Sequence, residues 1–387
     1  MPKDAGGSDA TPGRRLTILS ILSMAERGGS DHAFLRMIRT LPPEEFDCHV
    51  VAPAEPPLRR ELETAGATVH VVRLRRLTGS GGLGYWVAYA LAWPVAVVRL
   101  ARLARRVRAD VIHTNSLHSL YGWAAALLVR RPHVWHDREI VVQSRAALRL
   151  ERFLARRSAA VVAISQAVAD ALDVPGTRVI LDDVDAEEFG PHRAGRFRGI
   201  AGIGDGVPLV GFVGRLDVWK GLDVVLDALP AVRQAVPDAE LVVAGPTVAD
   251  KEDYAEGLRQ RARHVGGVHW LGTRDDVPAL VADLDVLASP STHPEPFGLV
   301  LVEALASGVP VVATNAGGPV EIAARAEPGA VHLVPAATPA PWPRPWSTCS
   351  RRPRPDRAPA GPGCGSPAGP RSRRCSGRRH DADRRVP

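Results

Sequence analysis

The chain has 387 residues, of which 45% are apolar, so it can hold two domains and is too apolar to be largely disordered. Its net charge of +7 comes from segment 336–387, which holds twelve Arg, no Lys and three Asp. The rest of the chain holds 37 basic and 39 acidic side chains, and this near neutrality gives no reason to expect nucleic-acid binding.

Strand-like and helix-like segments alternate along the first half of the chain. Runs rich in Val and Ile predict strands at Leu16–Leu22, Cys48–Ala52, Thr68–Val72, Asp110–His113, Val134–His136 and Ala160–Ile164. Helical patterns separate them at Asp31–Leu41, Leu58–Ala65, Tyr85–Val107, Ser119–Val129 and Ala147–Arg157. This alternation predicts a parallel sheet covered by helices on both faces.

The same alternation restarts in the second half. Strands are expected at Leu209–Val213, Glu240–Ala244, Val268–Leu271, Asp285–Ala288, Val309–Ala313 and Ala330–Val334. Helices are expected at Leu222–Ala235, Glu252–Val265, Val277–Asp283, Leu299–Ala306 and Val320–Ala326. A Gly-rich polar linker, Asp185–Val207, separates the two series. The fold class is therefore α/β, with two Rossmann-like doubly wound domains at 14–186 and 187–335 facing a cleft.

The segment Leu77–Val98 contains no charged residue. Pro94 interrupts it, and its apolar part, about 14 residues, is shorter than the roughly 20 that a spanning helix needs. We expect a helix facing the core. The alternative is a helix on a membrane surface, because Arg99, Arg102, Arg105 and Arg106 follow.

The expected compartment is the cytoplasm, with peripheral contact at the inner face of the membrane as an option. Before the tail the chain holds one cysteine, Cys48, and its first residues lack the pattern of a signal peptide. The segment 336–387 holds eleven Pro and no Ile, Leu, Phe, Tyr or Met. Such a segment cannot build a core. We interpret it as out-of-frame readthrough that truncates the second domain, with a natural disordered basic tail as the alternative.

The strongest chemical signal is the segment from His293 to Gly308, which follows the strand-like residues ending at Ser291. Glu295 lies in a loop and Glu303 in the helix that follows, and Gly298 opens that helix. The first backbone N–H groups of this helix would face a ligand in the cleft. An ordinary helix start with a surface Glu is the plainer alternative.

A second signal, Gly214–Gly221, follows the first strand of the second domain. Arg215 and Lys220 flank a strand-to-helix turn, where two cations would suit a pyrophosphate leaving group. Solvated Arg and Lys side chains are the plainer alternative.

Together these segments resemble the retaining glycosyltransferases of family four, which have the GT-B fold. Further similar segments are Arg27–Ser30, Val134–Arg138, Ala163–Ser165 and Thr314–Glu321. The resemblance covers nearly the whole chain before the tail. Two departures stand out: Leu181–Asp185 replaces the family's Asn-Gly-Val-Asp turn, and the C-terminal helices of the family have no counterpart after Pro335.

The resemblance implies a role for each matching residue. Arg215 and Lys220 would hold the donor diphosphate, and Gly28 and Gly29 would let the backbone approach it. Glu303 would contact the ribose of the nucleotide. The transferred sugar would contact Glu295 and the backbone of Phe297, Gly298 and Leu299, and His136 would lie near that sugar and the acceptor. The catalytic candidates are His136, Glu295, Arg215 and Lys220. His113 and His118 are rivals of His136 that we place at a strand edge and a helix start.

Two weaker patterns are interpreted as structural. Gly79–Gly84 fits a dinucleotide fingerprint, but it follows the third strand rather than the first, so no NAD site is expected. Asp283 and Asp285 mimic a metal-binding pair, yet they bracket a helix end and a strand start. No metal and no cofactor is expected beyond the nucleotide-sugar co-substrate.

The predicted activity is transfer of a hexosyl group from a nucleoside diphosphate sugar to an acceptor hydroxyl with retention of configuration. The acceptor is unknown and is either a small molecule or a lipid-linked one. The alternatives are a GT-B-like sugar-nucleotide epimerase and an inactive truncated remnant.

Overall fold

The computed structural model describes residues 14–22, 28–75, 82–116, 119–141, 144–204, 206–248 and 251–336. These residues all belong to one compact unit, Met1–Thr348. Several positions considered above lie outside the described residues, namely Arg27, Gly79–Gly81, His118 and the tail from 337 on.

The first sheet is parallel and has seven strands in the order β3-β2-β1-β4-β5-β6-β7. Its strands are β1 (Leu16–Leu22), β2 (Phe46–Ala52), β3 (Thr68–Val71), β4 (Val111–Asn115), β5 (His133–Asp137), β6 (Ala160–Ala163) and β7 (Arg178–Val179). The strand order reverses direction between β1 and β4, and ligands of doubly wound sheets bind outside the carboxyl ends at such a point.

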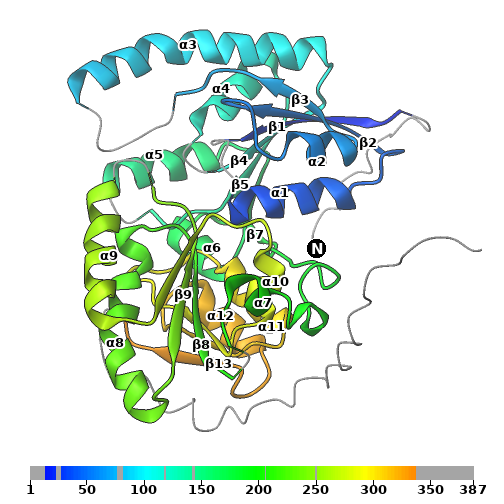
Figure 1. Cartoon of the computed structure of the whole chain (residues 1–387). Helices are drawn as coiled ribbons and strands as arrows, with labels where there is room; N and C mark the ends of the chain where they lie inside the picture. The colour runs from blue at the N-terminus through cyan, green and yellow to red at the C-terminus, as the bar shows by residue number, and fades with distance from the viewer. Residues whose placement is uncertain are drawn as a thin grey trace, which may run out of the picture. The chain divides into compact units, whose positions relative to one another are not determined.

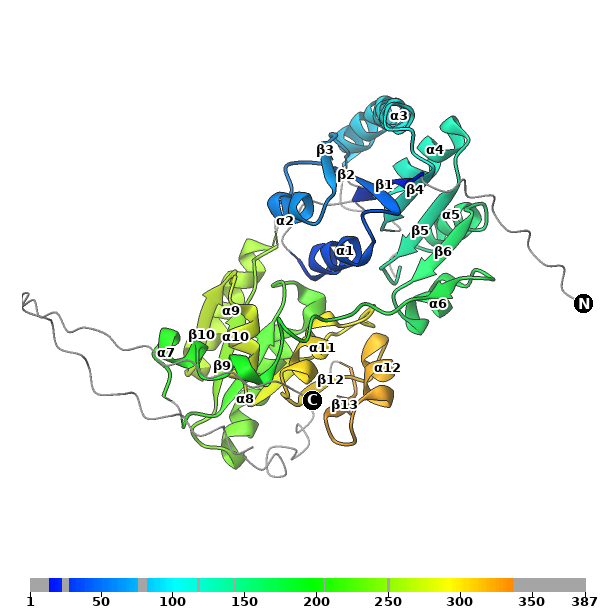
Figure 2. The ribbon, with the colours of Figure 1, turned by 90° about the vertical axis from the view of Figure 1, so that its right-hand side faces the viewer.

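Helices cover both faces of this sheet, because alternate strand residues point to opposite sides. The helices are α1 (Gly29–Thr40), α2 (Arg59–Thr64), α3 (Leu83–Arg106), α4 (Leu120–Val129), α5 (Arg145–Ala155) and α6 (Gln166–Leu172). Leu19 and Ile21 pack with residues of α3 and α4, whereas Cys48 and Val50 pack with residues of α1 and α2. Figures 1 and 2 show these two helix pairs on opposite faces of the sheet.

The second sheet is also parallel, with six strands in the order β10-β9-β8-β11-β12-β13. Its strands are β8 (Leu209–Val213), β9 (Glu240–Ala244), β10 (Val268–Gly272), β11 (Val286–Ser289), β12 (Val311–Thr314) and β13 (Val331–Val334). Its helices are α7 (Phe197–Ala201), α8 (Leu222–Ala235), α9 (Glu252–Val265), α10 (Val277–Ala282), α11 (Leu299–Ala306) and α12 (Gly318–Arg325), with 3-10 turns η1 (Pro191–Arg193) and η2 (Val218–Lys220). The prediction of two Rossmann-like sheets is confirmed.

The segment expected to be the linker carries structure of its own. It contains α7, in which Phe197 and Arg198 are fully buried. The backbone N–H of Arg198 donates to Asp283 at 3.0 Å, and its guanidinium donates to Asp285 at 2.8 Å. The structural interpretation of these two aspartates is therefore confirmed, because they anchor this segment to the second core.

The helix expected at Tyr85–Val107 is confirmed to within two residues at each end by α3, Leu83–Arg106. Helix α3 has 24 residues and continues through Pro94. Among the described residues it is the one helix long and apolar enough to cross a membrane, by length and composition only. One of its faces packs on the core as expected, whereas the other carries exposed apolar side chains.

Candidate active site

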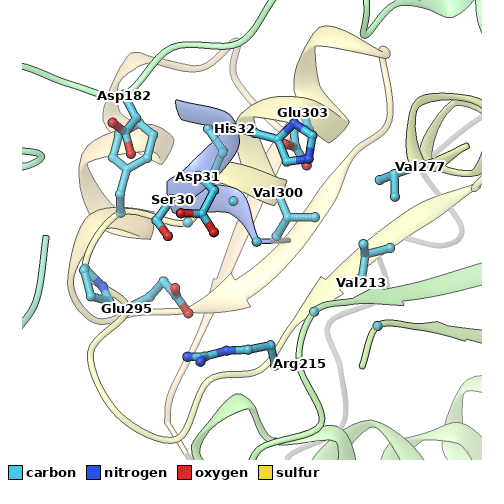
Figure 3. Close-up of a pocket in the computed structure, with 18 of the residues that line it drawn as sticks. Ser30, Asp31, His32, Asp182, Val213, Arg215, Val277, Glu295, Val300 and Glu303 are labelled. Carbon is cyan, nitrogen blue, oxygen red and sulfur yellow. The ribbon is translucent and has the colours of Figure 1, made fainter. Parts of the chain in front are cut away.

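A cavity of about 470 Å³ lies where strands of both sheets end. The first sheet contributes residues that follow β1, β4, β5 and β6, and the second contributes residues that follow β8, β9, β10 and β11. Figure 3 shows Arg215 and Glu295 pointing into this space from two different segments. Ligands of α/β sheets bind at such strand ends, so this cavity is the candidate active site.

Lys220 and Glu295 form an ion pair on the cavity wall. The Lys220 ammonium donates to the two Glu295 carboxylate oxygens at 2.8 and 2.7 Å. The buried hydroxyl of Ser291 donates to the same carboxylate at 2.8 Å, and Lys220 also lies 4.2 Å from the centre of the Trp219 ring. The ammonium is thus held in a defined position, where an incoming anion would meet it.

Glycines fix the loop that carries Glu295. A Cβ at Gly317 or Gly318 would lie 2.2 Å from the carbonyl oxygen of Glu295 or Phe297, respectively. The Gly318 N–H donates to the Glu295 carbonyl at 2.8 Å. Only residues without a side chain allow this close backbone contact. Gly317 and Gly318, at the amino end of α12, therefore fix the position of the loop that carries Glu295.

The first turn of α11 completes this wall. Gly298 begins the helix with a φ of 96°, a left-handed conformation that favours glycine. Glu303 follows on the same helix and lines the cavity. Burial raises the pKa of Glu303 to about 7, while Arg36 lowers this pKa and Glu188 raises it further. Glu303 therefore changes its charge close to neutral pH.

The opposite wall begins at the amino end of α1. Gly28 caps this helix in an extended conformation, and Asp31 lies in its first turn. A Cβ at Gly29 would lie 3.3 Å from the Leu299 side chain, so the loop passes close to α11. Ser30, Asp31 and His32 point toward the cavity beside these glycines (Figure 3).

Comparisons with known proteins decide the family. A model described as glycosyl transferases group 1 matches residues 195–337, and one described as glycosyl transferase 4-like domain matches residues 28–181. A 2-deoxystreptamine glucosyltransferase of Streptomyces kanamyceticus is 30% identical over 302 residues, which are 69% of this chain and 75% of the relative. The chain belongs to this family of glycosyltransferases.

Two further similarities extend the comparison. A lipopolysaccharide core biosynthesis mannosyltransferase, LpsB of Rhizobium meliloti, is 34% identical over 170 residues, which span 43% of this chain and about half (48%) of that relative. The crystal structure of Anabaena Alr3699/HepE in complex with UDP and glucose superposes with a TM-score of 0.73 at 28% identity, covering 87% of this chain and 90% of the other. The glycosyltransferase thus has the GT-B fold that its sequence predicts.

Nine of the ten residues predicted to form the site line the cavity. They are Gly28, Gly29, Arg215, Lys220, Glu295, Phe297, Gly298, Leu299 and Glu303. Their convergence in one place is a structural finding, while the roles assigned to them by resemblance stay predictions.

His136 differs from the other nine, because it is not among the residues that line the cavity. Its Nε2 is buried and has no hydrogen-bond partner among the described residues. Burial holds the pKa of His136 well below its usual value, and His113 and Arg138 lower it further. The imidazole of the glycosyltransferase is therefore neutral at pH 7, and its catalytic role stays a prediction.

His113 lies in β4 near the centre of the sheet rather than at a strand edge. Its Nδ1 lies 3.1 Å from the Ser20 hydroxyl, and its ring is 5.7 Å from that of His136. It packs inside the first domain, which agrees with a structural role.

The structure also places groups at the cavity that carry no predicted role. Arg138 follows β5 and pairs with Asp182, with one N–O distance of 3.0 Å. Arg36 of α1 lines the cavity and pairs with Asp183 at 3.3 Å. Asn115 ends β4, and its buried Oδ1 lacks a partner among the described residues. Asp182 and Asp183 are the acids by which the chain departs from its family's turn, and each neutralises an arginine of this wall.

Proposed function

We propose that this glycosyltransferase moves a hexosyl group from a nucleoside diphosphate sugar to an acceptor hydroxyl with retention of configuration. Three kinds of support converge: the resemblance of its motifs to the retaining enzymes of family four, the family shown by its relatives, and the likeness to an Anabaena protein solved with UDP and glucose. The proposed donor site is the second-domain wall of the cavity, and the proposed acceptor site is the first-domain wall.

The observation that carries the proposal is the pairing of Lys220 with Glu295 beside Arg215 on one wall. A donor has an anionic diphosphate joined to a neutral sugar. We propose that the diphosphate binds Arg215 and Lys220, while the sugar hydroxyls donate to Glu295. When the donor binds, Lys220 and Glu295 would thus exchange their contact with each other for contacts with the diphosphate and with the sugar, respectively.

The nucleoside would extend along α11 toward Glu303. Its ribose hydroxyls are hydrogen-bond donors, which an ionised carboxylate accepts. The amino end of α11 at Gly298 and Leu299 would present backbone N–H groups to the sugar or to the phosphate. Gly29 allows the first-domain loop to approach the same region without a side chain in the way.

In the proposed reaction, the bond between the anomeric carbon and the diphosphate oxygen breaks. The acceptor oxygen bonds to the same carbon on the same face, and its proton passes to the departing phosphate. Arg215 and Lys220 stabilise the charge that develops on the leaving group. This electrostatic stabilisation is the main way in which the protein would lower the activation barrier. We propose that these two cations act without a divalent metal.

The test is a panel of nucleoside diphosphate sugars with mixed acceptors. Release of nucleoside diphosphate identifies the donor, and NMR of the glycoside gives the configuration of the new bond. Retained configuration and equal rates with and without EDTA are expected. An inverted product would overturn retention, and loss of activity with EDTA would overturn metal independence.

Two other outcomes would overturn transfer itself. Conversion of the nucleotide sugar into an epimer, with no glycoside formed, would show that the protein is an epimerase. No turnover together with no donor binding in calorimetry would show an inactive chain. Lys220→Ala should weaken both turnover and donor binding, whereas Lys251→Ala is the matched control, because Lys251 lies outside the cavity.

A further inference from the structure

Helix α3 has an outer stripe of apolar side chains that no described part of the chain covers. The stripe consists of Val87, Leu91, Val95 and Val98, spaced three or four residues apart so that they share one side of the helix. Trp86, 38% exposed, lies beside the start of this stripe and packs on Tyr89. Leu91 is 72% exposed, and Val87 and Val95 are each 51% exposed. No charged residue occurs from Gly82 to Val98, so the exposed side of the helix is apolar over this whole length. Soluble monomers rarely expose a continuous surface of this kind.

The opposite side of α3 holds the helix on the sheet. Tyr89, Val97 and Leu100 are buried and pack in one cluster with strand residues such as Leu19 and Ile112. Figures 1 and 2 show α3 as the outer layer on this face, next to α4. Withdrawing α3 to cross a bilayer would uncover the sheet. In the folded chain this helix can therefore lie along a surface but cannot span one.

Arginines follow the outer stripe directly. Arg99, Arg102, Arg105 and Arg106 are all exposed on the last turns of α3. The Arg105 guanidinium donates to the Leu128 carbonyl at 3.1 Å, which places the exposed Leu127 and Leu128 of α4 beside this arginine end. Apolar side chains and cations thus form one continuous patch.

Acidic side chains are nearly absent from this part of the sequence. From Gly82 to His136 the chain holds seven Arg and one acid, Asp110. That acid is already paired with Arg14 at 2.8 Å. A second copy of the same patch would bring like charges together, whereas a surface of anionic lipid would complement both the stripe and the arginines.

We propose that the outer stripe of α3 and its arginine end dock this protein on an anionic lipid bilayer. The apolar side chains enter the boundary between headgroups and acyl chains, with Trp86 suited to that boundary because its ring is apolar with a polar N–H. The arginines contact anionic headgroups. This docking needs no donor or acceptor and is independent of the proposed transfer reaction.

The test is co-sedimentation of the full chain with vesicles of phosphatidylcholine alone or mixed with phosphatidylglycerol. Binding is expected to the mixed vesicles, and salt should weaken it. The double change Leu91→Glu and Val95→Glu should reduce binding by about tenfold or more, because two apolar groups of the stripe become anionic. Changing Arg99, Arg102, Arg105 and Arg106 to Gln should also reduce it by about tenfold or more at low salt.

Matched controls separate this patch from other sources of binding. Ile200→Glu changes an apolar residue of α7 that is 69% exposed and should leave binding unchanged. The twelve arginines of segment 336–387 are present in every variant, so any binding due to them would be equal throughout. Circular dichroism and thermal unfolding identify any variant that fails to fold.

A second readout is local. Brominated lipid should quench tryptophan fluorescence, and Trp86→Phe should remove part of that quenching. Equal vesicle binding by the wild-type chain and both α3 variants would overturn the proposal. So would a dimer in light scattering that Leu91→Glu dissociates, with no vesicle binding, because the stripe would then be an interface between copies.

Discussion

The two walls of the candidate active site are built in different ways. In the second-domain wall, all the residues with predicted roles come from two short contiguous segments, Arg215–Gly221 and Glu295–Glu303, and the second of these is held by close backbone contacts. The first-domain wall brings together residues far apart in the chain through side-chain ion pairs, such as Arg138 with Asp182. The difference would suit the proposed donor site, which requires fixed geometry, and the proposed acceptor site, whose specificity would depend on a few hydrogen bonds.

The largest expected effect tests the donor wall directly. Lys220→Ala should lower kcat/KM for transfer by about 100- to 1000-fold, by analogy with the loss of one oxyanion donor. It also leaves the Glu295 carboxylate without its ammonium partner. The measurement is steady-state kinetics beside the Lys251→Ala control. Similar rates for the two variants would place the diphosphate elsewhere.

The fixed geometry of the donor wall is tested by adding one methyl group. Gly318→Ala should destabilise the fold by about 1–3 kcal/mol, because its Cβ would lie 2.2 Å from the Phe297 carbonyl oxygen. Donor affinity should fall as well. Gly257→Ala in α9 is the control, since nothing lies within 4 Å of its Cβ. There the same change should stabilise the helix by about 0.5–1 kcal/mol. Chemical unfolding measures both variants. Equal stabilities would show that the amino end of α12 can move to make room for the added methyl group.

The charge of Glu303 predicts a pH dependence of donor binding. Burial raises its pKa to about 7, and ribose hydroxyls bind the ionised form. Below pH 7 a proton must leave before the donor binds, so affinity should fall by about tenfold per pH unit, whereas above pH 7 it should level off. The nucleotide sugar itself keeps a constant charge there, because both of its phosphates are esterified.

Calorimetric titration of the donor across this pH range gives the comparison. Glu303→Gln should abolish the pH dependence, because the amide does not titrate. A variant that keeps the wild-type profile would assign the titration to another group.

The smallest effect is expected where the two domains touch. The Glu321 carboxylate of α12 accepts hydrogen bonds from the backbone N–H groups of Gln166 and Ala167 at 3.0 and 2.7 Å, and the Ser165 hydroxyl donates to Pro296 at 2.6 Å. Glu321→Ala leaves the N-cap residue Ser165 in place but removes the acceptor of the first two N–H groups of α6, and should cost about 1 kcal/mol. Thermal unfolding measures this, and the exposed Glu327→Ala should have no effect. Equal Tm values for both variants would show that the contact between Glu321 and the amino end of α6 adds no stability.

The sequence predicted those site residues that belong to a short motif, in which charged side chains and glycines are only a few residues apart. Glu295, Glu303, Arg215 and Lys220 stand beside glycines at strand-to-helix turns, and parallel strands bring such turns to one edge of a sheet. Arg36 and Asp182 were not predictable as site residues, since each is separated by many residues from the group with which it pairs. The sequence placed His136 at a strand end and so predicted that it would face the cavity. In the structure it does not line the cavity with the other nine residues.

The sequence by itself determined the two parallel sheets and most of their elements. Strands such as Leu16–Leu22 and Leu209–Val213 were located to the residue, because buried parallel strands form uniform apolar runs between helical periods. It did not locate β7, α6 or α7, which are short and depend on tertiary contacts such as those of Arg198 with Asp283 and Asp285. Tertiary structure also decided which side of α3 is covered, because periodicity identifies the faces of a helix but not what packs against them.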